Sequence, residues 1–152
     1  MTLLLMGCLH RPLAEVRPVE EVAGFKIEVL GTTIAGTGVF VEEGDQLVFQ
    51  ALTPAGTALF SVRDGVDSEP EVQAPKEEMA EMLARIPWYR DLSLLFRWDC
   101  PQGRCTVETG RIIQTPDARR YRGEGGPATV TLTAETVELW DPRRRYRLTV
   151  LR

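Results

Sequence analysis

Three cysteines are the residues of this chain best suited to covalent chemistry. Cys100 and Cys105 flank the tetrapeptide Pro-Gln-Gly-Arg, whose composition is typical of a turn, and strand-like runs lie on either side of it. A tight hairpin brings two such sulfurs within bridging distance, and disulfides persist in oxidising compartments such as the bacterial periplasm. The pattern favours a disulfide over free buried thiols. It also favours a disulfide over a metal site, because no second pair of Cys or His residues completes four ligands.

The third cysteine ends the run Leu5-Met6-Gly7-Cys8, which resembles a bacterial lipobox. In a lipobox an apolar residue stands three places before the cysteine, and a small residue directly before it lets a signal peptidase cleave there. The thiol takes a diacylglyceryl group before cleavage. Each buried CH₂ contributes about 0.8 kcal/mol, so several acyl chains hold a protein firmly to a bilayer. The resemblance implies that Cys8 is a lipid attachment site.

The segment before Cys8 is short for an export signal. Such a signal has a basic start and an apolar stretch of about 7–15 residues, whereas seven residues precede Cys8 and none of them is basic. We favour residues 1–8 as a truncated lipoprotein signal, and a chance match is the alternative. Residues 9–22 contain Pro12, Pro18 and charges of both signs, which predicts an extended tether. Residues 23–152 are then a single domain.

The composition is that of a globular protein. Of 152 residues, 43% are hydrophobic and 26% are charged. The formal net charge of -4 argues against a nucleic-acid partner, because a nucleic-acid-binding domain carries a basic patch. The arginines at 143–145 are predicted to lie in a solvated turn. No run reaches the roughly 18 apolar residues of a transmembrane helix.

Most of the chain after Gly24 has the alternation of half-buried strands. Turn residues separate these runs at regular intervals, and the polar, Gly-rich stretch 119–126 is predicted to be a loop. The expected strands are 25–30, 34–42, 46–52, 57–62, 92–98, 106–107, 111–114, 128–133, 136–140 and 146–151. We therefore predict a mainly β fold (α+β), with a curved antiparallel sheet or incomplete β-barrel of about nine or ten strands.

One main helix is expected over 76–86, between Pro75 and Pro87. Met79, Met82 and Leu83 follow helical spacing and form a single apolar stripe. Such a stripe usually covers the open face of a sheet, so we expect the helix to cap the barrel. A role facing lipid stays open, since methionine adapts to varied apolar shapes.

The capped sheet would enclose an apolar interior. Its predicted lining is Val39, Phe49, Leu59, Phe60, Met79, Met82, Leu83, Phe96 and Trp98. The sequence leaves open whether this interior is a packed core or a cavity that holds an acyl chain. The lone histidine, His10, lies in the predicted tether, so serine and cysteine nucleophiles lack a base. We expect no enzymatic activity, cofactor or metal.

Three features together resemble the lipoprotein receptor LolB and a shorter LolB-like lipoprotein family. They are the lipobox, the strand–turn–strand run Leu-Val-Phe-Gln-Ala-Leu-Thr-Pro-Ala-Gly-Thr-Ala-Leu-Phe over 47–60, and the terminal strand Tyr-Arg-Leu-Thr-Val over 146–150. The resemblance implies an incomplete barrel with helices across its mouth and an apolar cavity inside. It also implies attachment to the periplasmic face of a bacterial envelope, with the outer membrane as the expected address.

LolB receives acylated lipoproteins from the carrier LolA and inserts them into the outer membrane. This chain is shorter and has one clear predicted helix, and residues 31–34 are a poor match for LolB's protruding loop. Our hypothesis is therefore an envelope lipoprotein that binds an acyl-bearing ligand, either a lipid or the acyl chains of a lipoprotein. The alternative is a structural or interaction lipoprotein with a packed barrel that docks a periplasmic protein.

Overall fold

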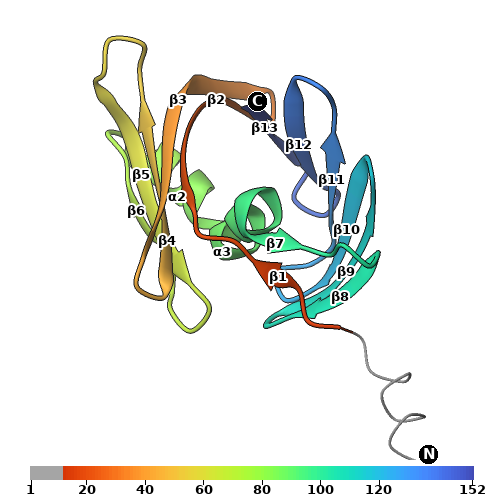
Figure 1. Ribbon diagram of the computed structural model, residues 1–152. Coiled ribbons are helices and arrows are strands. Elements are labelled where there is room, and N and C mark those ends of the chain that lie inside the picture. Colours follow the sequence, from red (N-terminus) through yellow and green to blue (C-terminus); the bar gives the residue numbers. More distant parts are fainter. Residues whose placement is uncertain (1–11) are drawn as a thin grey trace, which may run out of the picture.

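A computed structural model describes residues 12–152. The predicted signal 1–8, the attachment residue Cys8 and His10 lie outside the described residues. Thirteen strands and two short helices make up the described chain, together with one π-helical turn. The prediction of a mainly β fold with a curved antiparallel sheet is confirmed (Figure 1).

Eleven strands form one open antiparallel sheet in which almost every connection is a hairpin. One half consists of β2 (Glu20–Val29), β3 (Thr32–Glu43), β4 (Gln46–Leu52), β5 (Ala58–Gly65) and β6 (Glu71–Gln73). The other half consists of β13 (Tyr146–Leu151), β12 (Thr136–Asp141), β11 (Ala128–Leu132), β10 (Ala118–Gly123), β9 (Gly110–Thr115) and β8 (Arg104–Val107). The halves join where β2 pairs with β13, so β6 and β8 are the two edges.

The connection from β6 to β8 crosses the concave side of the sheet (Figure 1). It contains α2 (Glu77–Ala84), α3 (Trp88–Leu92), the π-helical turn η1 (Ser93–Arg97) and β7 (Trp98–Asp99). The predicted strand 92–98 is wrong, because most of it is helical. The run is mostly apolar and largely buried, and periodicity cannot distinguish a buried helix from a buried strand in such a run.

The strand count is also corrected, from nine or ten to thirteen. The predicted loop 119–126 contains most of β10, whose alternation was hidden by its arginines. The other additions, β1 (Glu15–Val16), β6 and β7, have two or three residues each, which is too short for a detectable period. The single expected helix is α2, and α3 follows it after Pro87.

The described part of the predicted tether is extended and belongs to the fold. The backbone N–H of Thr106 in β8 donates to the Pro12 carbonyl at 2.9 Å, and the Ala14 N–H donates to the Thr106 carbonyl at 3.0 Å. β1 then pairs with β7, and β2 begins at Glu20. This N-terminal segment, residues 12–16, therefore runs along the edge strand β8 and across the crossover to reach the sheet.

Candidate ligand site in the concave face

A cluster of aromatic rings fills the concave face of the β2–β5 half. The Phe49 ring is central, with its centroid 4.5 Å from that of Phe40, 5.0 Å from Phe25, 5.2 Å from Phe60 and 5.5 Å from Trp88. Most of these pairs meet edge to face, which is a favourable geometry for aromatic rings. The sheet contributes four phenylalanines and α3 contributes the tryptophan. This part of the interior is therefore packed by the protein's own side chains.

Register explains which predicted lining residues reach this interior. Phe40 lies opposite Phe49, and Val39 lies opposite Gln50, so β3 and β4 turn Phe40 and Phe49 inward. Val39 points to the opposite, convex face, and its assignment to the lining is corrected. Phe40 is fully buried and was missed, although it is the next residue of the same alternating run. Where several consecutive residues of a strand are apolar, the sequence does not show which face of the strand is buried.

The other predicted lining residues lie on the concave side but do not form one surface. Phe49, Phe60, Leu83 and Trp98 are buried core residues, and Leu59, Met79, Met82 and Phe96 are partly buried and pack against the core. The crossover divides them, because the Trp98 ring stacks on Tyr121 of the β8–β13 half, 6.0 Å between centroids.

A hollow of about 500 Å³ lies at the rim of the β2–β5 half, next to the segment that leads into α2. Two of the predicted residues, Leu59 and Phe60, line it. Its full lining is Gln50, Ala51, Leu52, Ala58, Leu59, Phe60, Ser61, Gln73, Ala74 and Pro75. Its volume falls within the range of about 300–1,000 Å³ that is usual for small-molecule sites. This rim hollow can take an apolar chain whose polar end stays in water.

Helix α2 is held to the core mainly at its end. Leu83 is the one fully buried residue of the helix, whereas Met79 and Met82 are half-buried. The Trp88 indole N–H donates to the Leu83 carbonyl at 2.8 Å and fixes the last turn. At the start, Lys76 makes no capping hydrogen bond with its side chain, so the first turn lacks a stabilisation worth about 1 kcal/mol.

Helix α3, in contrast, is fixed by a buried ion cluster. The Arg90 guanidinium donates to Asp91 through Nε at 2.9 Å, and through Nη2 to Asp141 of β12 at 2.8 Å and to the Tyr146 hydroxyl of β13 at 3.0 Å. The Tyr146 hydroxyl in turn donates to Asp91. Arg90, Asp91, Asp141 and Tyr146 are all buried. The backbone carbonyls of Gly125 and Gly126 accept further bonds from Arg90 at 2.9 and 3.0 Å.

The pKa shifts within this cluster follow from burial and charge. Burial raises the pKa of Asp91 despite the neighbouring Arg90. Burial and the Asp91 carboxylate both raise the pKa of Tyr146, which keeps this hydroxyl protonated as a donor. Burial alone would raise the pKa of Asp141, but the Arg144 backbone N–H and the Arg90 guanidinium donate to its carboxylate and lower the pKa. Burial disfavours the charge on Arg90, yet its anionic partners outweigh burial and raise the pKa.

A second buried carboxylate attaches α3 to the other half of the sheet. Asp64 of β5 accepts hydrogen bonds from the backbone N–H groups of Tyr89 and Gly65, both at 2.9 Å. Burial raises the pKa of Asp64, and these two hydrogen bonds oppose that rise. Because Asp64 lies in one half and Asp141 in the other, α3 connects the two halves across the open interior. This arrangement was not predicted, since isolated acidic residues in a sequence do not reveal their partners.

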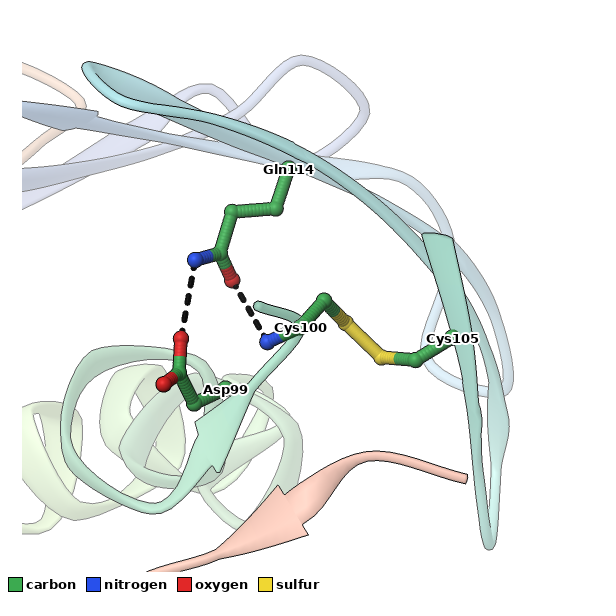
Figure 2. The surroundings of a disulfide bond; sticks show 4 residues. All are labelled: Asp99, Cys100, Cys105 and Gln114. Carbon is green, nitrogen blue, oxygen red and sulfur yellow. Dashed lines mark hydrogen bonds between the residues drawn. A yellow bond between two sulfur atoms is a disulfide. The ribbon is translucent and has the colours of Figure 1, made fainter. Parts of the chain in front are cut away.

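The crossover ends at a disulfide between Cys100 and Cys105, which confirms the predicted pairing (Figure 2). The two Cα atoms are 5.5 Å apart, and the bond joins the residue after β7 to edge strand β8. Gln114 of β9 accepts from the Cys100 N–H and donates to Asp99, both at 2.8 Å. The C-terminal end of the crossover is therefore attached to the sheet, just as α3 attaches its central part.

No protein-family model matches this chain, and no curated protein matches its sequence. Among the described residues, no helix has the length and apolar character needed to span a membrane.

Proposed function

We propose that this chain is a lipoprotein of the bacterial cell envelope that binds an acyl-bearing hydrophobic ligand in a LolB-like half-barrel. Cys8 would carry the membrane anchor on the periplasmic face, with the outer membrane as the expected address. The observation that carries the ligand proposal is the rim hollow, which opens next to α2 and reaches the aromatic core at Phe60. The open curved sheet with helices on its concave side agrees with what the LolB resemblance implies.

The unequal attachment of the two helices suggests how a ligand enters. α3 is fixed from both halves of the sheet by Asp64 and Arg90, so it would stay in place. α2 is fixed at its last turn and lacks a side-chain cap at its first, so it can swing about Leu83. That movement would widen the rim hollow and bring Met79 and Met82 onto the ligand. Methionine side chains adapt well to varied acyl chains.

A structural or protein-interaction lipoprotein is the second candidate, and the aromatic cluster favours it. Because the rings around Phe49 contact one another, the centre of the β2–β5 half is a packed core. A ligand would then be restricted to the rim hollow. The two candidates differ in whether a lipid occupies that hollow in the purified protein.

Native mass spectrometry with added fatty acid or phospholipid tests the ligand proposal. We expect a bound lipid mass on the wild-type chain. Leu59→Glu should weaken that binding at least about tenfold, because it places a charge in the hollow. A tenfold loss corresponds to about 1.4 kcal/mol of binding free energy. Val22→Glu is the matched control, because Val22 is an exposed apolar residue of β2 that does not line the hollow. An apo mass that lipid does not change would reject the carrier function and favour the interaction module.

The anchor is tested by fractionating cells that express the chain in its native reading frame, including codons upstream of Met1. We expect wild-type protein in the membrane fraction and Cys8→Ser protein in the soluble periplasmic fraction, because the variant cannot be acylated. Cys100→Ser combined with Cys105→Ser is the control, because it removes the two disulfide-bonded cysteines and leaves Cys8 in place. A wild-type protein found in the soluble fraction would contradict the anchor.

A further inference from the structure

Four arginines lie on the outer face of β8, β9 and β10. Arg104 belongs to β8, Arg111 to β9, and Arg120 and Arg122 to β10, and all four are exposed. Their immediate neighbours along the strands are the buried Cys105, Ile112 and Tyr121, which turn inward to the core. Because side chains alternate between the faces of a strand, the four arginines share the outer face. None of them was singled out from the sequence, where they are dispersed over 19 positions from 104 to 122.

Register brings these arginines together. Arg111 lies directly opposite Arg122, and Ile113 lies between Arg104 on one side and Arg120 on the other. The side chain of Ile113 is itself exposed, at 45%. We call Arg104, Arg111, Ile113, Arg120 and Arg122 the arginine face. The other outward positions of the three strands are Thr106, Thr115 and Ala118, so no carboxylate lies on this face.

The positive charge of the arginine face is not neutralised within the fold. In residues 12–152, none of its four arginines forms an ion pair, whereas Arg17, Arg63 and Arg97 each do. Like charges directly opposite one another destabilise a sheet. The chain as a whole has a formal net charge of -4, so this concentration of cations is local. A surface of this kind attracts an anionic partner.

The attachment of the N-terminal segment indicates which anionic partner this is. Thr106 of β8, which lies opposite Arg111 in the register, hydrogen-bonds to Pro12 and Ala14 through its backbone. Cys8 precedes Pro12 by four residues, which span about 14 Å at most. An acyl anchor on Cys8 would therefore meet the bilayer close to this corner of the sheet. Leu13, also at this corner, is 79% exposed.

We propose that the arginine face lies against an anionic lipid bilayer, with the guanidinium groups on phosphate headgroups and Ile113 among the acyl chains below them. The choice of a membrane as the partner rests on the proposed anchor at Cys8. The arginine face itself is a feature of the structure and does not depend on that anchor. Basic residues near an anionic membrane surface each strengthen binding about fivefold. The face would orient the domain on the membrane, leaving the β2–β5 half and its rim hollow turned away from the contact.

Co-sedimentation of the unacylated full chain with lipid vesicles tests this proposal independently of Cys8. We expect binding to vesicles that contain phosphatidylglycerol, little binding to pure phosphatidylcholine, and loss of binding at high salt. Arg111→Gln combined with Arg122→Gln should weaken binding about 25-fold, at roughly fivefold per arginine. Arg143→Gln combined with Arg145→Gln is the matched control, because it removes two exposed arginines at the β12–β13 turn. We expect the control to bind like the wild type.

Three results would overturn the membrane contact. These are equal binding to both kinds of vesicle, equal weakening by both double variants, and no binding at all. A short single-stranded DNA that displaces the protein from vesicles, and whose own binding is lost in the Arg111/Arg122 variant, would assign the arginine face to nucleic acid instead. Failure here leaves the rim hollow and the acyl anchor untouched, since both are tested by separate measurements.

Discussion

Arg90→Met should lower the free energy of unfolding by about 3–5 kcal/mol, because it leaves the buried Asp91 without a cation and takes one of two cations from the buried Asp141, which keeps Arg144. Asp91 and Asp141 are fully buried, and Arg90 donates to both. Methionine occupies similar volume, so the loss reports charge rather than a cavity. Chemical denaturation at neutral pH measures it. Natural domains are stable by about 5–15 kcal/mol, so the variant keeps a measurable folded population only if wild-type stability lies above the lower part of that range.

The pH dependence of this loss separates charge from packing. Without Arg90, the pKa of the Asp91 carboxyl should be raised further in the folded state, so the native variant binds this proton more tightly than its unfolded chain does. The penalty is complete above that raised pKa and disappears below the unfolded value of 3.8. The deficit relative to wild type should therefore shrink as the pH falls toward 4. A deficit that is constant with pH would contradict this account.

Arg147→Met is the matched control for Arg90→Met. Arg147 pairs with Glu138 on the surface, where the two side chains are 43% and 37% exposed. Exposed pairs contribute about 0–1 kcal/mol, so this variant should unfold nearly like the wild type.

Phe49→Ala should lower the free energy of unfolding by about 3–5 kcal/mol, the usual cost of truncating a buried phenylalanine. Its ring contacts four others and none of its surface is exposed. The control is Phe96→Ala, whose ring is partly exposed and lies 4.5 Å from that of Phe40, and which should cost less. A cost of less than about 1 kcal/mol at Phe49 would show that the interior is loosely packed, which would extend the ligand space inward from the rim hollow.

Alternation and turn residues were sufficient to predict the curved sheet, most of its strands and the disulfide. They failed over 92–98, a mostly apolar and largely buried run, because such a run contains no clear period. They failed again in β10, because Arg119, Arg120 and Arg122 gave that strand the composition of a loop. Two-residue strands such as β1 carry no local signal at all and form because a partner strand is within reach.

The candidate site was predicted in parts. Leu59, Phe60 and the α2 stripe were identified from spacing, but Val39 was assigned to the wrong face, because the register between β3 and β4 decides which residues of an apolar run turn inward. The ion cluster around Arg90 and the arginine face both depend on residues far apart in sequence. Only strand pairing reveals such groupings, and a single sequence does not contain that pairing explicitly.

The hydrogen bonds between residues 12–14 and β8 have a consequence for self-association. An unpaired edge strand is a template on which another chain can add a strand, and natural proteins cover or shorten such edges. Here one edge, β6, is three residues long, and the other is occupied by the protein's own N-terminal segment. Removing residues 1–22, a common way to prepare a lipoprotein domain, would uncover the Thr106 backbone groups. The shortened protein would then be prone to pair edge to edge and aggregate, and the tether segment protects against this while it leads to the membrane.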